Sequence, residues 1–244
     1  MEGGLGLDSD EAVVPTPTRV GTWSDWTAVA GGQDHTCGIR AGGLLYCWGW
    51  NAFGRAGQPG LWDEYRIPTL VDAGDGWTSL SASNDYACGI QDGMVRCWGW
   101  DPSFDSLGAL PPSPDVPRTM SDLDGWTEVA AASGYLCGIR GGEASCMGAN
   151  DFGQLGDGTQ TSRTTLAPVT TVDVGWADLS AGERAVCGIT ATHQLWCWGS
   201  NDGGRLGDGT SVDRLVPTRI GTASDWIDAD LGAAGSYGVR GQTG

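Results

Sequence analysis

Apolar residues occur along the chain in short runs of four to six residues, rich in β-branched and aromatic side chains and bounded by Gly, Asn or Asp. Runs of this length with these boundaries are typical of β-strands. No segment keeps apolar residues at a 3.6-residue period over ten residues or more, so we expect no helix of any length. The 42 glycines suit an all-β chain with many tight turns, because glycine adopts positive φ without steric cost.

The strand pattern repeats about every fifty residues. Five tryptophans at spacings of 51, 49, 50 and 50 residues each open one copy; these are Trp26, Trp77, Trp126, Trp176 and Trp226. A fixed period of this length indicates a repeat architecture, and several short strands per unit indicate a β-propeller with one blade per repeat. We therefore expect one all-β propeller domain over residues 1–244, with about five blades. A solenoid is the alternative.

The two ends of the chain complement each other in the repeat. Residues 3–26 match residues 203–226 without a gap, so we expect residues 1–25 to complete the last blade, which starts at Trp226. The match leaves residues 195–200 without a counterpart in that blade. Our hypothesis is that the last blade is one strand short and that a partner adds the strand by β-augmentation. A blade that tolerates three strands, or a fragment of a longer protein, are the alternatives.

Further residues recur at fixed places in the repeat. Four copies carry Cys-Gly-Ile; a second cysteine follows nine or ten residues after the first, and Trp-Gly follows it in three copies. Loops such as Asn-Asp-Phe-Gly-Gln-Leu-Gly-Asp-Gly-Thr at residues 150–159 come next, and then a proline. Over essentially the whole chain this pattern resembles the repeat of the regulator of chromosome condensation family, in a secreted, disulfide-containing member of bacterial type. The resemblance implies a β-propeller, although family members typically have seven blades.

The eight cysteines form four pairs that each flank one predicted hairpin turn. We expect the disulfides Cys37–Cys47, Cys88–Cys97, Cys137–Cys146 and Cys187–Cys197. Zinc is the weaker alternative, because zinc knuckles use C-x2-C spacing and clustered histidines, and the chain has only two histidines. Paired cysteines indicate an oxidising compartment, so we expect an extracellular, periplasmic or cell-surface protein. We expect no signal peptide in the first ten residues and no transmembrane span.

The formal net charge of −17 argues against nucleic acid and anionic membranes as partners, since phosphate binding needs basic residues. The chromatin role of the family's namesake is therefore not expected here.

We find no catalytic triad, phosphate loop or distinctive carboxylate pair, and expect neither an enzyme nor a cofactor. Asp151, Asp157, Asp202 and Asp208 lie in loops that look superficially like calcium loops but lack EF-hand spacing. We expect structural turns there and no metal.

Aromatic residues outside the repeat pattern are the candidate binding residues. Trp50, Phe53, Trp62, Tyr65, Trp100 and Phe104 lie in or beside the long loops of the first two repeats, while Tyr86 and Tyr135 stand before the first cysteine, where the first repeat has His35. Loop aromatics suit a protein-binding patch, because Trp and Tyr dominate interface hot spots. The alternative is that they fill gaps between blades.

We therefore expect a non-enzymatic extracellular protein-binding scaffold, which would suit a subunit of a larger assembly and could take a partner strand at its last blade. A glycan-binding lectin is the first alternative, with a loop tryptophan stacking on sugar. It is weakened because Trp50 and Trp100 are replaced by Ala149 and Ser200 in the same phase. The resemblance also implies, as a second alternative, a secreted inhibitor similar to the propeller-type β-lactamase inhibitory protein.

Overall fold

The computed structural model of the chain describes residues 4–8, 14–60, 62–100, 115–119, 124–170, 175–232 and 235–241. These residues form strands β1 to β18 and two three-residue 3-10 turns, η1 (Ala52–Gly54) and η2 (Asp202–Gly204). The all-β prediction is confirmed. No helix within these ranges is long and apolar enough to cross a membrane.

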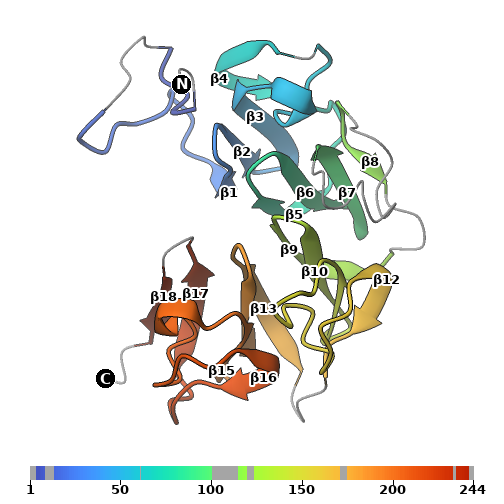
Figure 1. Cartoon of the computed structure of the whole chain (residues 1–244). Helices are drawn as coiled ribbons and strands as arrows, with labels where there is room; N and C mark the ends of the chain where they lie inside the picture. The colour runs from blue at the N-terminus through green and yellow to red at the C-terminus, as the bar shows by residue number, and fades with distance from the viewer. Residues whose placement is uncertain are drawn as a thin grey trace. The chain divides into compact units, whose positions relative to one another are not determined.

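The strands form antiparallel sheets, each built from strands that follow one another in the chain (Figure 1). We call these sheets blades 1 to 5. Blade 1 comprises β1 (Trp26–Gly31), β2 (His35–Arg40), β3 (Leu44–Trp50) and β4 (Glu64–Leu70); blade 2 comprises β5 (Trp77–Ala82), β6 (Tyr86–Gln91), β7 (Met94–Gly99) and β8 (Arg118–Thr119). Blade 3 comprises β9 (Trp126–Ala132), β10 (Tyr135–Arg140), β11 (Glu143–Gly148) and β12 (Arg163–Pro168). Blade 4 comprises β13 (Trp176–Ala181), β14 (Ala185–Thr190), β15 (Leu195–Gly199) and β16 (Arg214–Arg219), and blade 5 comprises β17 (Trp226–Leu231) and β18 (Ser236–Arg240).

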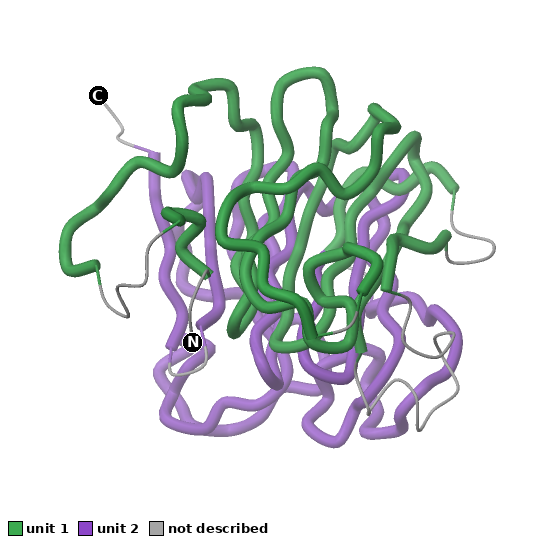
Figure 2. Tube along the Cα trace, turned by 90° about the horizontal axis from the view of Figure 1, so that it is seen from above, with its two compact units in different colours: residues 1–101, 110–129 green, residues 102–109, 130–244 purple. Residues whose placement is uncertain are grey.

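The chain divides into two compact units (Figure 2). Unit 1 contains residues 1–101 and 110–129, and unit 2 contains residues 102–109 and 130–244. Blades 1 and 2 lie in unit 1, blades 4 and 5 lie in unit 2, and the division falls within β9 of blade 3.

All four predicted disulfides are present: Cys37–Cys47, Cys88–Cys97, Cys137–Cys146 and Cys187–Cys197. In each blade the two cysteines stand directly opposite each other on the second and third strands. Their Cα atoms are 4.1 Å apart, as expected for a pair of antiparallel residues that do not hydrogen-bond to each other. The register of the hairpin therefore brings the sulfurs together.

The Cys-Gly-Ile signature is explained by the tryptophan that opens each repeat. In blade 4 the Trp176 ring lies over the backbone of Gly188, where a Cβ would come within 2.6 Å of it. Trp176 also packs against Trp198 of the third strand, with ring centroids 5.4 Å apart. The same glycine–tryptophan contact recurs at Gly38, Gly89 and Gly238. A side chain at this position would displace the indole from the blade core.

The loops after β3, β11 and β15 are each organised by a buried asparagine, at Asn51, Asn150 and Asn201. Asn150 shows the pattern: its Oδ1 accepts the backbone N–H of Leu155 at 2.9 Å, and its Nδ2 donates to the carbonyl oxygen of Thr159 at 3.0 Å. The side chain thus satisfies buried backbone groups that no strand pairs with.

The aspartates of these loops act as turn residues. Asp208 accepts hydrogen bonds from Arg214 at 2.8 Å, Thr210 and Asn201. Burial alone would raise the pKa of Asp208, but these hydrogen bonds outweigh it and hold the pKa below its usual range. Asp157 has the corresponding bonds to Arg163, Thr159 and Asn150. The side chains of Asp151 and Asp202 are exposed.

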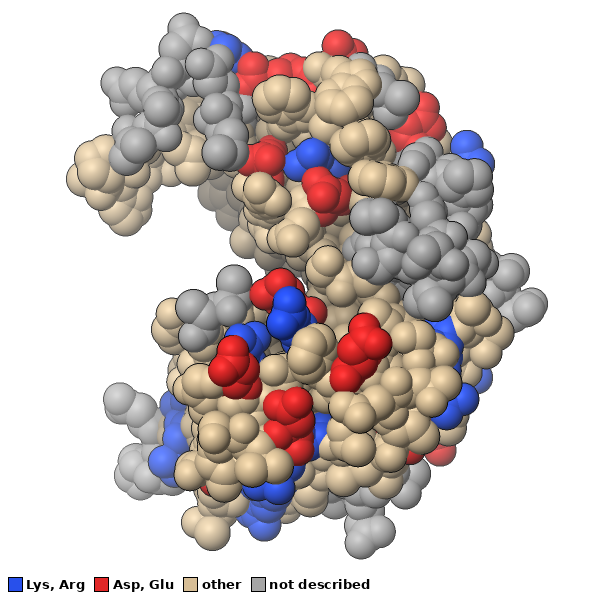
Figure 3. All heavy atoms as spheres, viewed as in Figure 1, with Lys and Arg blue, Asp and Glu red and all other residues tan. Residues whose placement is uncertain are grey.

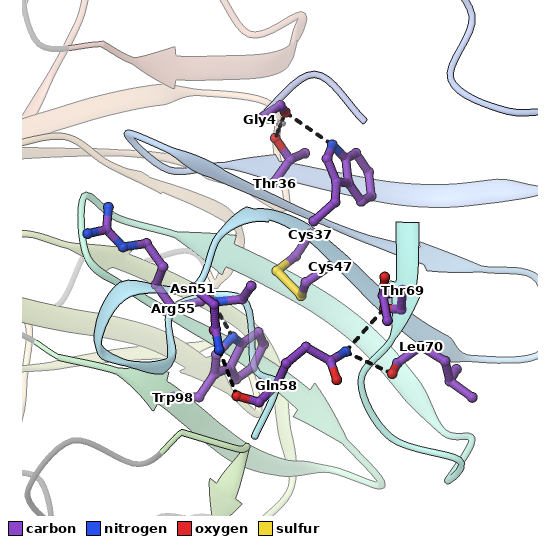
Figure 4. Close-up of a disulfide and its surroundings, with 12 residues drawn as sticks. Gly4, Thr36, Cys37, Cys47, Asn51, Arg55, Gln58, Thr69, Leu70 and Trp98 are labelled. Atoms are coloured by element: carbon purple, nitrogen blue, oxygen red, sulfur yellow. Dashed lines mark hydrogen bonds between the residues drawn. A yellow bond between two sulfur atoms is a disulfide. The ribbon is translucent and has the colours of Figure 1, made fainter. Parts of the chain in front are cut away.

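Within unit 1, the N-terminal segment packs against blade 1 in the way that the loop of blade 1 packs against blade 2. The indole of Trp98 donates to the carbonyl oxygen of Arg55 in the loop of blade 1, at 3.1 Å. The indole of Trp48 donates in the same way to Gly4, also at 3.1 Å (Figure 4). Residues 4–8 therefore lie against blade 1 as a repeat loop lies against the next blade.

This contact also corrects the alignment of the chain ends. The Trp48 indole packs on Gly6 as the Trp98 indole packs on Gly57. Gly57 corresponds to Gly207 in the loop sequence. Gly6 therefore corresponds to Gly207, an offset of 201 residues, whereas Trp26 corresponds to Trp226, an offset of 200 residues. The predicted gapless match is off by one residue at Gly6.

Blade 5 contains two strands in the described part of the chain, β17 and β18. Residues 14–19, which correspond to β16 in the repeat, do not form a strand.

Candidate interaction surface

The loop between β3 and β4, residues 51–63, carries two of the candidate aromatic residues, Phe53 and Trp62. Its start is fixed by Asn51, which donates to the carbonyl oxygen of Gln58 at 2.8 Å and accepts the N–H of Ala56 at 2.9 Å. Gln58 in turn donates to the carbonyl oxygen of Leu70 at 2.8 Å (Figure 4). The loop is therefore held at its start by Asn51 and tied from its middle, through Gln58, to the end of β4.

Three aromatic side chains gather on this loop and on the end of β7. The ring of Phe53 lies between two indoles, with centroid distances of 4.8 Å to Trp62 and 4.7 Å to Trp100. We call Phe53, Trp62 and Trp100 the aromatic cluster. Trp62 is 60% exposed, while Phe53 and Trp100 are half-buried. The Trp62 indole therefore faces solvent while the Phe53 ring packs against it.

Two of these residues hold a backbone conformation that their side chains disfavour. Phe53 has φ 57° and Trp62 has φ 76°, in the left-handed region that is costly for residues with a Cβ. In blade 4 the position of Phe53 is occupied by Gly203, with φ 68°. The loop thus keeps a phenylalanine where the repeat geometry favours glycine, and such strain is often found at functional sites.

Two more of the predicted aromatic residues flank the cluster. Trp50, at the end of β3, is 40% exposed and pairs with Glu64 of β4. Tyr65 is half-buried and donates its hydroxyl to the carbonyl oxygen of Pro59 at 3.3 Å. Burial and the nearby charge of Asp63 raise the pKa of the Tyr65 hydroxyl.

Tyr86 and Tyr135 are not part of the surface, which corrects the expectation drawn from their place in the repeat. Their side chains are 1% and 0% exposed. The hydroxyl of Tyr135 donates to the carbonyl oxygens of Gly182 and Ala185 in blade 4, at 2.7 and 2.8 Å, and burial raises its pKa far above the usual range. Tyr135 thus joins neighbouring blades. Phe104 lies outside the described residues.

Arg55 is a residue of this site that sequence reasoning missed. Its buried guanidinium pairs with Asp34 at 3.3 Å and with Asp85 at 3.0 Å, and so connects blade 1 to the turn before β6. The ion pair fixes the loop against blade 2 near Trp100, whose backbone N–H donates to the carbonyl oxygen of Asp85 at 2.9 Å. The loop asparagines of the repeat were a signal for a rigid loop, but nothing in the sequence paired Arg55 with these acids.

A second exposed aromatic group was also missed. Trp23 stacks on the guanidinium of Arg40, 4.1 Å from ring to Cζ, and lies 5.0 Å from the ring of Tyr46. Asp25 holds Arg40 in place at 2.9 Å. This group is anchored by its own ion pair and shares no residue with the aromatic cluster.

Charged side chains of both signs lie on the face seen in Figure 3, where acidic and basic groups adjoin one another in several places and uncharged surface surrounds them. Exposed Asp63 and Glu64 adjoin the aromatic cluster, so its border is acidic, in keeping with the formal net charge of −17.

Comparison with known proteins finds a similar repeat. Models of the regulator of chromosome condensation (RCC1) repeat match residues 26–55, 176–205 and 192–238. The ultraviolet-B receptor UVR8 of Arabidopsis thaliana is 28% identical over 250 residues, which is 97% of this chain and 54% of the receptor.

Solved structures show the same fold. Human WBSCR16 superposes with a TM-score of 0.84 at 21% identity, covering 98% of this chain and 65% of that protein. Yeast RCC1, solved with Kap60, gives a TM-score of 0.77 at 17% identity, covering 98% of this chain and 60% of that one. The chain thus spans about half to two thirds of the length of these proteins. Over the matched residues the chain is similar to the repeat of the regulator of chromosome condensation, and its sheets have the fold of β-propeller blades.

Proposed function

We propose that the five repeats form one propeller domain that binds another protein outside the cytosol and has no catalytic role of its own. The observation that carries the proposal is the aromatic cluster, in which Phe53 supports an exposed Trp62. A large aromatic side chain held rigidly at the surface loses little entropy on binding and is the usual centre of an interface hot spot.

The other features fit a protein partner better than a small substrate. Yeast RCC1, on which this chain superposes, was solved with the protein Kap60 bound to it. The acidic border at Asp63 and Glu64 and the net charge of −17 would favour a basic partner surface by electrostatic steering. Four disulfides support an oxidising compartment, where the chain would act as a subunit of a larger assembly.

The test uses oxidised protein as bait in the secreted and envelope fraction of its source, followed by affinity measurements with the purified prey. Trp62→Ala should weaken that affinity by roughly tenfold or more, as expected for a hot-spot residue. Trp23→Ala, which removes an exposed tryptophan of unit 1 outside the cluster, should leave the affinity unchanged.

Equal affinity of the Trp62→Ala and unchanged proteins would overturn the proposed surface. Binding to a glycan array that disappears in Trp100→Ala would instead support a lectin.

A further inference from the structure

Arginine side chains stacked on aromatic rings recur in the described structure, each with a carboxylate beside it. In unit 1 the guanidinium of Arg40 lies 4.1 Å from the centre of the Trp23 ring, and Asp25 accepts its Nε–H at 2.9 Å. A guanidinium suits this arrangement, because its face attracts an aromatic ring while its edge donates to a carboxylate. Two similar groups lie in unit 2: Arg184 on Phe152 with Glu183, and Arg240 on Trp226 with Asp225.

The group around Phe152 is the repeat equivalent of the aromatic cluster. Phe152 stands two residues after Asn150, as Phe53 stands two residues after Asn51. Both asparagines accept a backbone N–H from five residues further along the loop, at 2.9 Å. The guanidinium of Arg184, in the turn before β14, lies 4.8 Å from the centre of the Phe152 ring. The phenylalanine of the blade 3 loop therefore receives an arginine from the next blade.

In unit 1 an acid takes the position of Arg184. The carbonyl oxygen of Asp85 accepts the N–H of Trp100 at 2.9 Å, and that of Arg184 accepts the N–H of Ser200 at the same distance. Asp85 and Arg184 therefore correspond. The carboxylate of Asp85 binds Arg55, the arginine of the blade 1 loop, at 3.0 Å, and the turn before β6 contains no arginine. The next blade thus supplies no guanidinium to the aromatic cluster.

The aromatic cluster has the other two members of such a group, an aromatic ring and a carboxylate. Trp62 is exposed and packs on Phe53, and Asp63 follows it in the chain and is also exposed. Both backbones are fixed by Asn51, which donates its N–H to the carbonyl oxygen of Asp63 at 2.8 Å and accepts that of Trp62 at 3.4 Å. An indole and a carboxylate are thus presented to solvent from a rigid backbone.

The carboxylate of Asp63 is not neutralised within the described part of the chain. Its neighbour Glu64 pairs with Arg66 at 3.3 Å, whereas Asp63 forms no ion pair among the described residues. The carboxylate lies over Gly60, where a Cβ would come within 2.5 Å of Oδ2, so it stays against the loop that carries Trp62. A cationic side chain from another protein would gain the two contacts that the internal arginines gain.

We propose that the partner protein inserts an arginine side chain at the aromatic cluster. The guanidinium stacks on the exposed face of Trp62 and donates to the carboxylate of Asp63, in the arrangement that Arg40 shows within unit 1. This inference rests on the proposed function, which assigns protein binding to the same cluster, and adds the chemical class of the residue that is bound. Arginine fits better than lysine, because the planar guanidinium stacks and donates at once, while an ammonium is a compact and strongly hydrated charge.

The test titrates the oxidised full chain with two peptides of equal charge, acetyl-Gly-Arg-Gly-Arg-Gly-amide and the same peptide with lysine for arginine. The indole N–H signal of Trp62 in nuclear magnetic resonance spectra reports binding and gives the affinities. The arginine peptide should bind roughly two- to fivefold tighter than the lysine peptide, as expected for a cation–π contact at an exposed site. A peptide with citrulline, which has the shape of arginine without its charge, should leave the Trp62 signal in place.

Three variants assign the contact. Asp63→Asn keeps the shape of the side chain but removes its charge, and should weaken binding of the arginine peptide several-fold. Asp75→Asn removes the same charge at an exposed residue of unit 1 outside the cluster, and should leave the affinity unchanged. Trp62→Ala, followed at the indole N–H of Trp100, should bind the arginine and lysine peptides equally.

Equal affinity of the arginine and lysine peptides for the unchanged protein, or a Trp62 signal that neither peptide moves, would overturn the inference. The proposed function would survive that result if Trp62→Ala still weakened binding of the purified prey, since the cluster would then bind protein through another contact. If Trp62→Ala left prey binding unchanged, the proposed surface would fail, and this inference with it.

Discussion

The indole N–H of Trp48 donates to the carbonyl oxygen of Gly4 at 3.1 Å, across 44 residues of sequence. Thr36 also donates its hydroxyl to Gly4, at 3.0 Å, and Asp8 donates its N–H to the carbonyl oxygen of Arg66 at 3.2 Å. The N-terminal segment is therefore held to blade 1 by bonds to three of its strands, although it contains no strand among the described residues.

Trp48→Phe should loosen this segment. Phenylalanine keeps an apolar ring against Gly6 but lacks the N–H, and loss of one hydrogen bond costs about 1 kcal/mol. We expect the amide of Asp8 to exchange several-fold faster in native-state hydrogen exchange. Trp98→Phe, which removes the equivalent bond to Arg55, should leave Asp8 unchanged. Equal exchange in all three proteins would show that Trp48 does not hold the segment.

His35 should make the protein sensitive to acid. It is buried, neither ring nitrogen has a hydrogen-bond partner in the described structure, and burial, with the charge of Arg55, lowers its pKa from 6.5 to about 3. Below pH 6.5 the unfolded chain therefore binds a proton at this site that the folded chain excludes until about pH 3. Over that range the site should lower the free energy of unfolding by up to about 1.4 kcal/mol per pH unit.

Urea unfolding at a series of pH values checks this contribution. His35→Tyr, which introduces the residue found at this position in blades 2 and 3, should flatten the dependence between pH 6.5 and 3. His193→Gln, at an exposed histidine, should leave it in place. If His35→Tyr and the unchanged protein lose stability in parallel, another group is responsible.

Removal of one disulfide should weaken the fold without abolishing it. Cys187 and Cys197 are ten residues apart, and a loop of this size stabilises the folded state by roughly 2.5–3 kcal/mol on the chain-entropy model. The double variant Cys187→Ser, Cys197→Ser should lower the urea midpoint accordingly. The same change at Cys37 and Cys47, with equal spacing, gives the matched comparison. An unchanged midpoint would mean that the disulfide adds nothing to stability.

The left-handed backbone at Phe53 can be tested by comparing two substitutions that both remove the ring. Phe53→Gly should be more stable than Phe53→Ala by about 1 kcal/mol, because only glycine adopts this conformation freely. Thermal unfolding of both variants gives the difference. If alanine is the more stable, the loop does not hold Phe53 at positive φ in solution.

The fold was predictable because its signals lie within one repeat. Trp176 and Gly188 recur together since the indole needs the space that a Cβ would fill, and each cysteine finds its partner across one hairpin. The bonds of the Trp48, Trp98 and Tyr135 side chains to backbone carbonyls were not predictable, because they join residues of different repeats. Tyr135 looked like a loop aromatic until its hydroxyl was seen to bond to Gly182 and Ala185, and nothing local in the sequence identifies those carbonyls.

The candidate surface was predictable only in part. The departure of Trp62 and Phe53 from the repeat pattern drew attention to their loop, but their contact depends on positive φ at two residues that are not glycine. Arg55 was missed because its partners, Asp34 and Asp85, lie 21 and 30 residues away, one of them in the next repeat. The one-residue offset at Gly6 likewise became visible only through the indole that rests on it.

The disulfides have a consequence for how the chain matures. Eight cysteines allow about 105 pairings, yet each native pair joins cysteines that are neighbours in sequence. A chain oxidised in the order of its synthesis closes each pair before the next cysteine appears. Its first covalent product is then already the native one, and oxidative maturation needs little reshuffling by a disulfide isomerase.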